Sequence, residues 1–342
     1  MQFKLLSAIG IIIIVSGHCY HGGMELAYNW FPPYSYNLAL FVFISGYFYK
    51  TDYEENIGKY IWKRTKRLLI PAYLWNIFYG GMVAFLGLFG FTIGAKPDLY
   101  NLFVMPFVDG EAFQYNLGSW FVYPLFLVCI INVLFRKFLK LIHLDNEFIV
   151  LIVYLAIGMI GINTAIGNPT AINGIVKLLV RTMFFLPCYE FGRFYKAVLE
   201  KKDTLNNVAY FAIIFAVQLI LLTFCKDLEY TPSSFTKFNN GFIIPYISSI
   251  TAIAFWLRVS RLLVPAIGNS KLVRLIADNT YGIMVNQLVG FMCLKFVFYG
   301  LSRITSGSLF GDFNVASFKS NIWYYYLCLL YTSPSPRDIS GS

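Results

Sequence analysis

The chain has 342 residues, of which 58% are hydrophobic and only 13% carry a charge. This charged fraction is about half that of a typical soluble domain, so the composition excludes an ordinary water-soluble fold. The formal net charge of +10 would suit a nucleic-acid-binding protein, but the lysines and arginines stand in short clusters between apolar runs. We therefore predict an integral membrane protein with no nucleic-acid partner.

Apolar segments recur along the whole chain, and each is long enough to be a candidate membrane helix. A bilayer core about 30 Å thick takes roughly 20 mainly apolar residues per helix. The pattern predicts an all-α polytopic bundle of about nine complete transmembrane helices, with a truncated tenth that begins near Asn321. The nine predicted segments are residues 3–20, 34–49, 68–92, 118–135, 148–166, 175–192, 207–225, 240–257 and 281–300.

The first segment ends in two histidines, His18 and His21. A histidine can take a proton from a hydroxyl group and return it to a leaving group, and polar groups at membrane depth are often functional. Alternatively, the histidines anchor the helix at the membrane interface. A metal site with Cys19 is disfavoured, because no carboxylate or further histidine follows at ligand spacing. We predict no metal.

The second segment ends with a small polar pair, Ser45 and Gly46, inside an aromatic run. A glycine lets helix backbones pack closely, so helix packing is one interpretation. The other is a close approach to a bound cofactor.

A basic cluster that includes Arg64 and Arg67 leads into the third segment. Two guanidinium groups at this spacing are suited to the phosphates of coenzyme A. Contact with anionic lipid headgroups, or a purely topological role, would explain the same cluster.

The sixth segment contains Arg181 and Glu190, two ionisable residues in an apolar context. Glu190 stands three residues before Arg193, which predicts a local ion pair at the inner interface. Arg181 is a candidate for a cation that faces a site.

Basic residues also predict the orientation. The connection between the second and third segments, and every second connection after it, together hold seventeen lysines and arginines, against five in the alternate connections. Basic connections face the cytoplasm, so we expect a cytoplasmic N-terminus.

The last stretch, from Cys328 to Asp338, reads CLLYTSPSPRD and resembles a translated sequencing-library adapter. We therefore predict one membrane domain over residues 1–327 and an artefactual tail over residues 328–342. A native disordered tail of similar composition is the alternative.

Several short motifs, in this order, resemble those of the membrane acyltransferase-3 family. They are Ile14-Val15-Ser16-Gly17-His18, Phe43-Ile44-Ser45-Gly46-Tyr47, Arg64 with Arg67-Leu68-Leu69-Ile70-Pro71, Gly118-Ser119-Trp120-Phe121 with Pro124-Leu125-Phe126, and Phe185-Leu186-Pro187 with Glu190-Phe191-Gly192. Many members have an arginine eleven residues before the motif histidine, where this chain has Ser7. With Lys4 as its nearest cation, the first helix resembles the lysine-led first helices of the fucose-acetylase-like branch.

The resemblance implies a bacterial cytoplasmic-membrane enzyme that transfers an acetyl-type group from acetyl-CoA to a sugar hydroxyl of a cell-envelope glycan or a lipid-linked sugar. It places the family's essential histidine at His18. As a hypothesis, we expect Arg64, Arg67, Ser45 and Gly46 near the donor, and Trp120, Arg181 and His21 near the acceptor. A tryptophan at a helix end also serves as an interface anchor. The competing functions are a transporter or flippase of a lipid-linked sugar and, less favoured, a structural membrane subunit.

Overall fold

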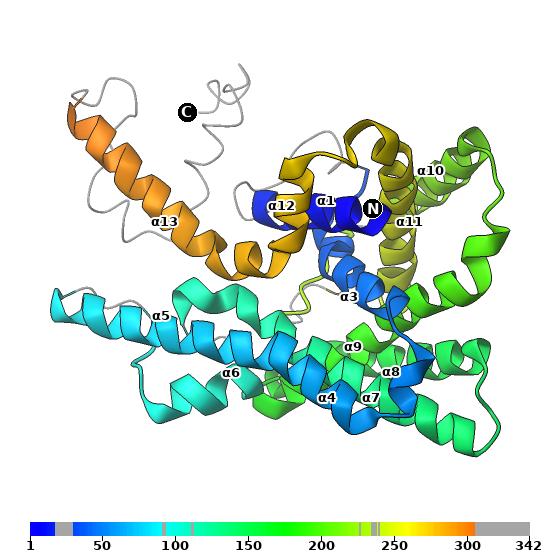
Figure 1. Cartoon of the computed structure of the whole chain (residues 1–342), viewed down its shortest axis with the longest axis horizontal. Helices are drawn as coiled ribbons and strands as arrows, with labels where there is room; N and C mark the ends of the chain where they lie inside the picture. The colour runs from blue at the N-terminus through cyan, green and yellow to red at the C-terminus, as the bar shows by residue number, and fades with distance from the viewer. Residues whose placement is uncertain are drawn as a thin grey trace.

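The computed structural model describes residues 1–17, 30–90, 94–110, 113–225, 227–233, 238 and 240–304, and the regular structure in these ranges is helical (Figure 1). The longer helices are α1 (Gln2–Gly17), α3 (Asn37–Tyr47), α4 (Ile57–Arg64), α5 (Ile70–Leu88), α7 (Val122–Leu141), α8 (Glu147–Gly167), α9 (Gly174–Phe194), α10 (Asn207–Phe224), α11 (Ile244–Ile267), α12 (Lys271–Asp278) and α13 (Thr280–Ile304).

Each of the nine segments predicted from the sequence coincides with one of these helices, which confirms an all-α polytopic membrane protein. Five helical spans in the described residues are long and apolar enough to cross a membrane. They are Ile57–Leu88, Tyr115–Leu141, Glu147–Gly167, Asn207–Phe224 and Ile244–Ile267. Helix α9 has a similar length but carries four charged residues, and α1 and α3 are shorter apolar helices. The predicted tenth segment and the tail after residue 327 lie outside the described residues.

Apolar side chains cover the outward faces of the long helices. On α5, Phe78 and Phe85 are more than half exposed, and Val208 and Phe224 on α10 are each 81% exposed. Water-soluble monomers rarely expose apolar surface of this extent, whereas lipid tails solvate it. These faces are therefore the lipid-contacting surface of the bundle.

Glycines bring the central helices into backbone contact. A Cβ added at Gly46 of α3 would overlap the carbonyl oxygen of Tyr189 in α9, and one at Gly192 would overlap the carbonyl oxygen of Phe43. Gly158 of α8 likewise leaves room for Pro187 of α9. Small residues permit this spacing, since helices in membranes associate mainly by packing. Helix α9 is consequently held between α3 and α8 in the lower half of Figure 1.

The basic cluster belongs to the same helical span as α5. Helix α4 continues through a π-helical turn, Thr65–Leu69, into α5, so the span begins eleven residues before the predicted start at residue 68. Pro71 stands in the first turn of α5, directly after the π turn and inside the continuous helical span. The π turn moves Arg67 away from the angular position that an α-helix would give it relative to Arg64.

The connection between the third and fourth predicted segments does not form a simple exterior loop. It contains a π-helical turn, Tyr100–Val104, the short α6 (Met105–Val108) and a 3₁₀ helix, Gln114–Phe121. The amide of Asn76 in α5 donates to the carbonyl oxygens of Asn101 and Leu102 at 3.1 and 2.8 Å. This segment therefore folds back along the middle of α5, with Leu99, Tyr100, Phe103 and Val104 exposed on its outer side.

Candidate active site

Two predicted acceptor residues, Trp120 and Arg181, lie in direct contact although 61 positions separate them. The Arg181 guanidinium carbon lies 4.4 Å from the centroid of the Trp120 indole, a cation–π arrangement. The exposed fractions of Trp120 and Arg181 are only 8% and 1%. The sequence suggested each residue separately, and the fold brings them together.

The Arg181 guanidinium also connects three segments of the chain. It donates to the carbonyl oxygen of Asp109 at 2.6 Å, to that of Pro232 at 3.3 Å and to that of Ser233. One turn earlier on α9, Lys177 pairs with the Asp109 carboxylate at 2.6 Å. We call Asp109, Gly110, Trp120, Lys177 and Arg181 the Trp120 cluster.

Gly110 lets the Trp120 cluster close. Its φ of 82° lies in the left-handed region, and an added Cβ would overlap the Cβ of Trp120. Only glycine meets both requirements, so the backbone at residue 110 can lie against the tryptophan.

A small pocket adjoins the Trp120 cluster. Its cavity volume is about 10 Å³, and it is lined by Tyr34, Ser35, Tyr36, Asn37, Leu38, Ala39, Phe184 and Pro232. This volume is enough for about one water molecule, so the pocket as it stands holds neither a sugar nor an acyl group. Pro232 belongs to both sites, because its carbonyl oxygen accepts from Arg181.

The pocket also adjoins the end of α1. The Tyr34 hydroxyl donates to the carbonyl oxygen of Gly17 at 3.1 Å. The predicted catalytic His18 follows Gly17 directly in sequence, but His18 and His21 lie outside the described residues. Their predicted roles remain predictions.

The predicted donor residues lie on different elements. Arg64 is half-buried, with its guanidinium 5.1 Å from the Tyr60 ring centroid, whereas Arg67 is exposed. Gly46 contacts the backbone of α9, so helix packing explains this glycine, and Ser45 beside it is half-buried. The structure therefore does not bring Arg64 and Arg67 to one point, and their binding of the donor stays a prediction.

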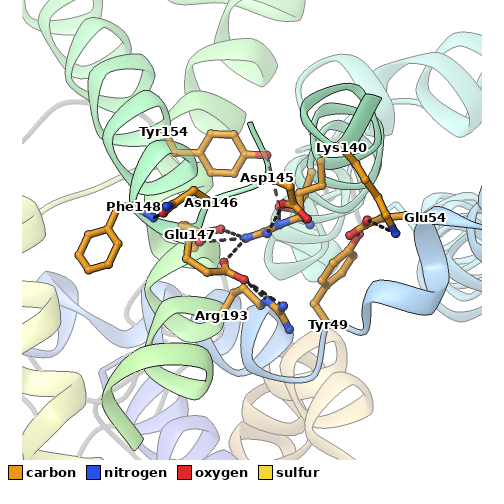
Figure 2. Close-up of polar contacts among 12 residues, drawn as sticks. Tyr49, Glu54, Lys140, Asp145, Asn146, Glu147, Phe148, Tyr154 and Arg193 are labelled. Atoms are coloured by element: carbon orange, nitrogen blue, oxygen red, sulfur yellow. Dashed lines mark hydrogen bonds and ion pairs between the residues drawn. The ribbon is translucent and has the colours of Figure 1, made fainter. Parts of the chain in front are cut away.

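A buried ion-pair network links α7, α8 and α9 (Figure 2). One guanidinium nitrogen of Arg136 lies 2.7 Å from carboxylate oxygens of both Glu147 and Glu190, and Arg193 pairs with Glu147 at 2.9 Å. Arg136 and Glu190 are 1% and 0% exposed, and Asp145 lies 3.8 Å from Arg136 at the edge. We call these five residues the Arg136 network.

The sequence prediction of a Glu190–Arg193 pair is wrong about the partner. Glu190 pairs with Arg136, and Arg193 pairs with Glu147. Neither pair has helical spacing, so local sequence contained no signal for them. On α7, Arg136 also donates to Asn132, one turn earlier, at 3.3 Å.

The described residues contain no group of three or more His, Cys, Asp or Glu side chains placed to hold a metal ion. The Trp120 cluster combines an aromatic ring with a buried cation, and the small pocket beside it adjoins the end of α1. Because the Arg181 guanidinium lies over the indole, the cluster can shape the protein wall next to the end of α1.

A family model described as an acyltransferase domain matches residues 3–332. No curated protein and no solved structure matches the chain.

Proposed function

The chain belongs to the membrane acyltransferase-3 family and is an acyltransferase, and from that premise we propose that it transfers an acetyl or similar acyl group from acyl-CoA to a sugar hydroxyl. The acceptor is a cell-surface polysaccharide or its lipid-linked precursor in a bacterial cytoplasmic membrane. The N-terminus is cytoplasmic in this proposal.

The observation that carries the proposal is the position of the Trp120 cluster. It adjoins the pocket, and the pocket adjoins the last residue of α1 before His18. Trp120 is 8% exposed and the Arg181 guanidinium lies over its ring, so the cluster shapes the wall beside the end of α1 and is not an open stacking face. The Trp120 cluster thus supports an acceptor sugar positioned beside His18, with His21 three residues further on.

Arg181 acts in this proposal as a positioning residue. Its donors hold the carbonyl groups of Asp109, Pro232 and Ser233 while its charge lies on the indole face. The guanidinium therefore orients Trp120 and one wall of the pocket.

The reaction is a transfer from sulfur to oxygen. The acceptor hydroxyl gives its proton to the imidazole of His18, and its oxygen attacks the thioester carbonyl carbon. A C–O bond forms, the C–S bond breaks, and the imidazolium returns the proton to the departing thiolate. A pKa near 6.5 suits histidine to both proton transfers.

The donor enters from the basic side of the protein. Arg67 is exposed among Lys63 and Lys66, a surface suited to the phosphates of the coenzyme, and Arg64 lies at its inner edge. The shared helix then leads from this surface into the bundle.

The test is acetyl-CoA-dependent labelling of cell-envelope glycans by membranes that contain the protein. We expect label with the parent chain and none with His18→Ala at equal expression. His143→Ala is the matched control and should label normally, because His143 lies in the turn after α7. Equal labelling by His18→Ala would refute the role of His18. No label from the folded parent, together with movement of a lipid-linked sugar across vesicles, would favour the transporter.

A further inference from the structure

A polar seam runs through the bundle where α5, the 3₁₀ helix with α7, and α13 meet. Gly118 lies against α13, since an added Cβ would be 2.8 Å from the carbonyl oxygen of Met284. On the other side, the Tyr79 hydroxyl of α5 donates to the side-chain oxygen of Asn286 at 2.8 Å. Three elements that are distant in sequence therefore share one polar interface inside the bundle.

Four side-chain oxygens in this seam are buried and have no hydrogen-bond partner among the described residues. They are Asn116 Oδ1, Tyr123 OH, Tyr281 OH and Gln287 Oε1. Asn116, Tyr123 and Gln287 are 1%, 0% and 8% exposed as residues. A buried polar atom without a partner is costly, typically by about 1–3 kcal/mol, and requires a specific explanation.

The four oxygens are grouped and not scattered. Tyr123 lies near both Tyr281 and Tyr73, and its ring centroid is 6.0 Å from that of Tyr73. Gln287 is one turn beyond Met284 on α13, and its amide nitrogen approaches Gly118, two residues from Asn116. The Asn116 amide donates to Asn76 at 3.2 Å, which fixes the direction of its free oxygen.

The hydrogen-bonding chemistry of the seam is specific. Asn116 Oδ1 and Gln287 Oε1 are acceptors, and the two phenols are donors. Two acceptors and two donors complement two secondary amides, because each amide offers one N–H group and one carbonyl oxygen. A hydrocarbon chain would leave all four oxygens unpaired.

The seam also lies on the path between the two ends of the proposed reaction. Arg64 and Arg67 stand on the helical span that continues into α5, and Tyr73 follows Arg64 by about 14 Å along the helix axis. The 3₁₀ helix at the other side of the seam ends at Trp120 and Phe121. The seam therefore lies between the basic surface and the Trp120 cluster.

We propose that the unpaired oxygens of Asn116, Tyr123, Tyr281 and Gln287 bind the two amides of the pantetheine arm of the acyl donor. This inference rests on the proposed function, since it takes a coenzyme A thioester as the donor. It assigns the donor arm to a specific polar seam at the depth of Asn76 and Tyr79, the middle of α5.

Binding is measured directly with S-acetylpantetheine, which has both amides and lacks the nucleotide, on the full chain in lipid nanodiscs. We expect Tyr123→Phe and Tyr281→Phe each to weaken binding by about five-fold, the effect of one hydrogen bond. The control Tyr100→Phe removes an exposed phenol of the same connection and should bind as the parent does. As a matched probe, S-acetyl-N-acetylcysteamine has a single amide and should bind more weakly to the parent.

The ligand-free thermal midpoint gives the second readout. Replacing an unpaired buried phenol by phenylalanine should leave that midpoint unchanged or raise it, whereas a structural hydroxyl would lower it. A lower midpoint, or unchanged affinity for S-acetylpantetheine in both variants, would overturn the inference.

The two proposals fail separately. Binding of S-acetylpantetheine by a chain that transfers no acyl group would leave the seam in place and refute the proposed function. Acyl transfer without any effect of the tyrosine variants on donor binding would refute the seam alone. Competition by a free saccharide at the same tyrosines, without competition by S-acetylpantetheine, would also refute it.

Discussion

The Trp120 cluster and the Arg136 network each contain an arginine that is 1% exposed, yet the two arginines serve different kinds of structure. Arg136 is bound by carboxylates of Glu147 and Glu190 and joins three regular helices. Arg181 stacks on an indole and donates to carbonyl groups of irregular segments. The first arginine fixes the helices, and the second shapes the loops beside the pocket. Buried charge alone therefore does not distinguish framework from site.

Among the substitutions that test this comparison, Glu190→Ala should have the largest effect on stability. It removes one carboxylate from a buried guanidinium, and breaking such a pair costs about 3 kcal/mol or more. We expect a large drop in the thermal midpoint in detergent, with acyl transfer lost along with the fold.

Lys4→Ala is the control for Glu190→Ala. Lys4 and Asp278 are 48% and 57% exposed, so their pair should contribute less than about 1 kcal/mol. A double variant, Arg136→Leu with Glu190→Leu, should recover part of the lost stability. Equal midpoints for Glu190→Ala and Lys4→Ala would show that the Arg136 network does not hold the helices.

Gly46→Ala separates packing from cofactor binding. The added methyl overlaps the carbonyl oxygen of Tyr189 and must push α3 from α9, at a cost of about 1–3 kcal/mol. Gly58→Ala is the matched control on α4, where an added Cβ has nothing within 4 Å, and it should be neutral or stabilising. A Gly46→Ala protein of full stability that no longer binds acetyl-CoA would restore the predicted cofactor role.

Arg181→Lys tests whether the second arginine shapes the site. Lysine keeps the charge but cannot reproduce the planar set of donors toward Asp109 and Pro232. We expect about ten-fold lower kcat/KM for the acceptor, equal to about 1.4 kcal/mol, and a small change in thermal midpoint. A midpoint drop as large as that of Glu190→Ala, with normal kcat/KM in the folded fraction, would make Arg181 a framework residue.

The smallest predicted effect is a pH dependence at the edge of the Arg136 network. Burial raises the pKa of Glu54 above 4.5, and Asp145 raises it further, although the Tyr49 hydroxyl, Lys140 and Arg136 oppose this. The folded protein therefore binds this proton more tightly than the unfolded chain does. Its contribution to stability falls as pH rises from about 4.5 through the raised pKa.

Thermal midpoints between pH 4.5 and 7 test this dependence. Glu54→Gln should remove that part of the pH dependence, because the amide does not titrate. An identical pH profile for Glu54→Gln and the parent would contradict the prediction.

The helices were predictable because apolar runs mark them directly. Each of the nine predicted segments contains a helix, and the all-α membrane class followed from composition. The fold-back of the segment around Asn101 was not predictable, since it depends on hydrogen bonds from Asn76 that join residues about 25 positions apart. A single lysine, Lys96, made that connection look like an ordinary loop.

The candidate site was only partly predictable for the same reason. Trp120 and Arg181 stood out one at a time, as an aromatic at a helix start and a cation in an apolar run. Their contact depends on how α9 lies against the connection before α7, which no local pattern encodes. The predicted partner of Glu190 was wrong because helical spacing favoured Arg193. The observed partner, Arg136, lies 54 positions before Glu190 in the sequence.

The contact between α3 and α9 has a consequence for the order of assembly during synthesis. Helix α3 has only eleven residues, too few to span a bilayer core alone. Its partner carbonyl, on Tyr189, is made about 140 residues after Gly46, which at ribosomal rates is about 7–30 s later. During that interval α3 lacks its packing partner α9. The insertion machinery or α1 therefore has to cover α3 until α9 has been synthesised.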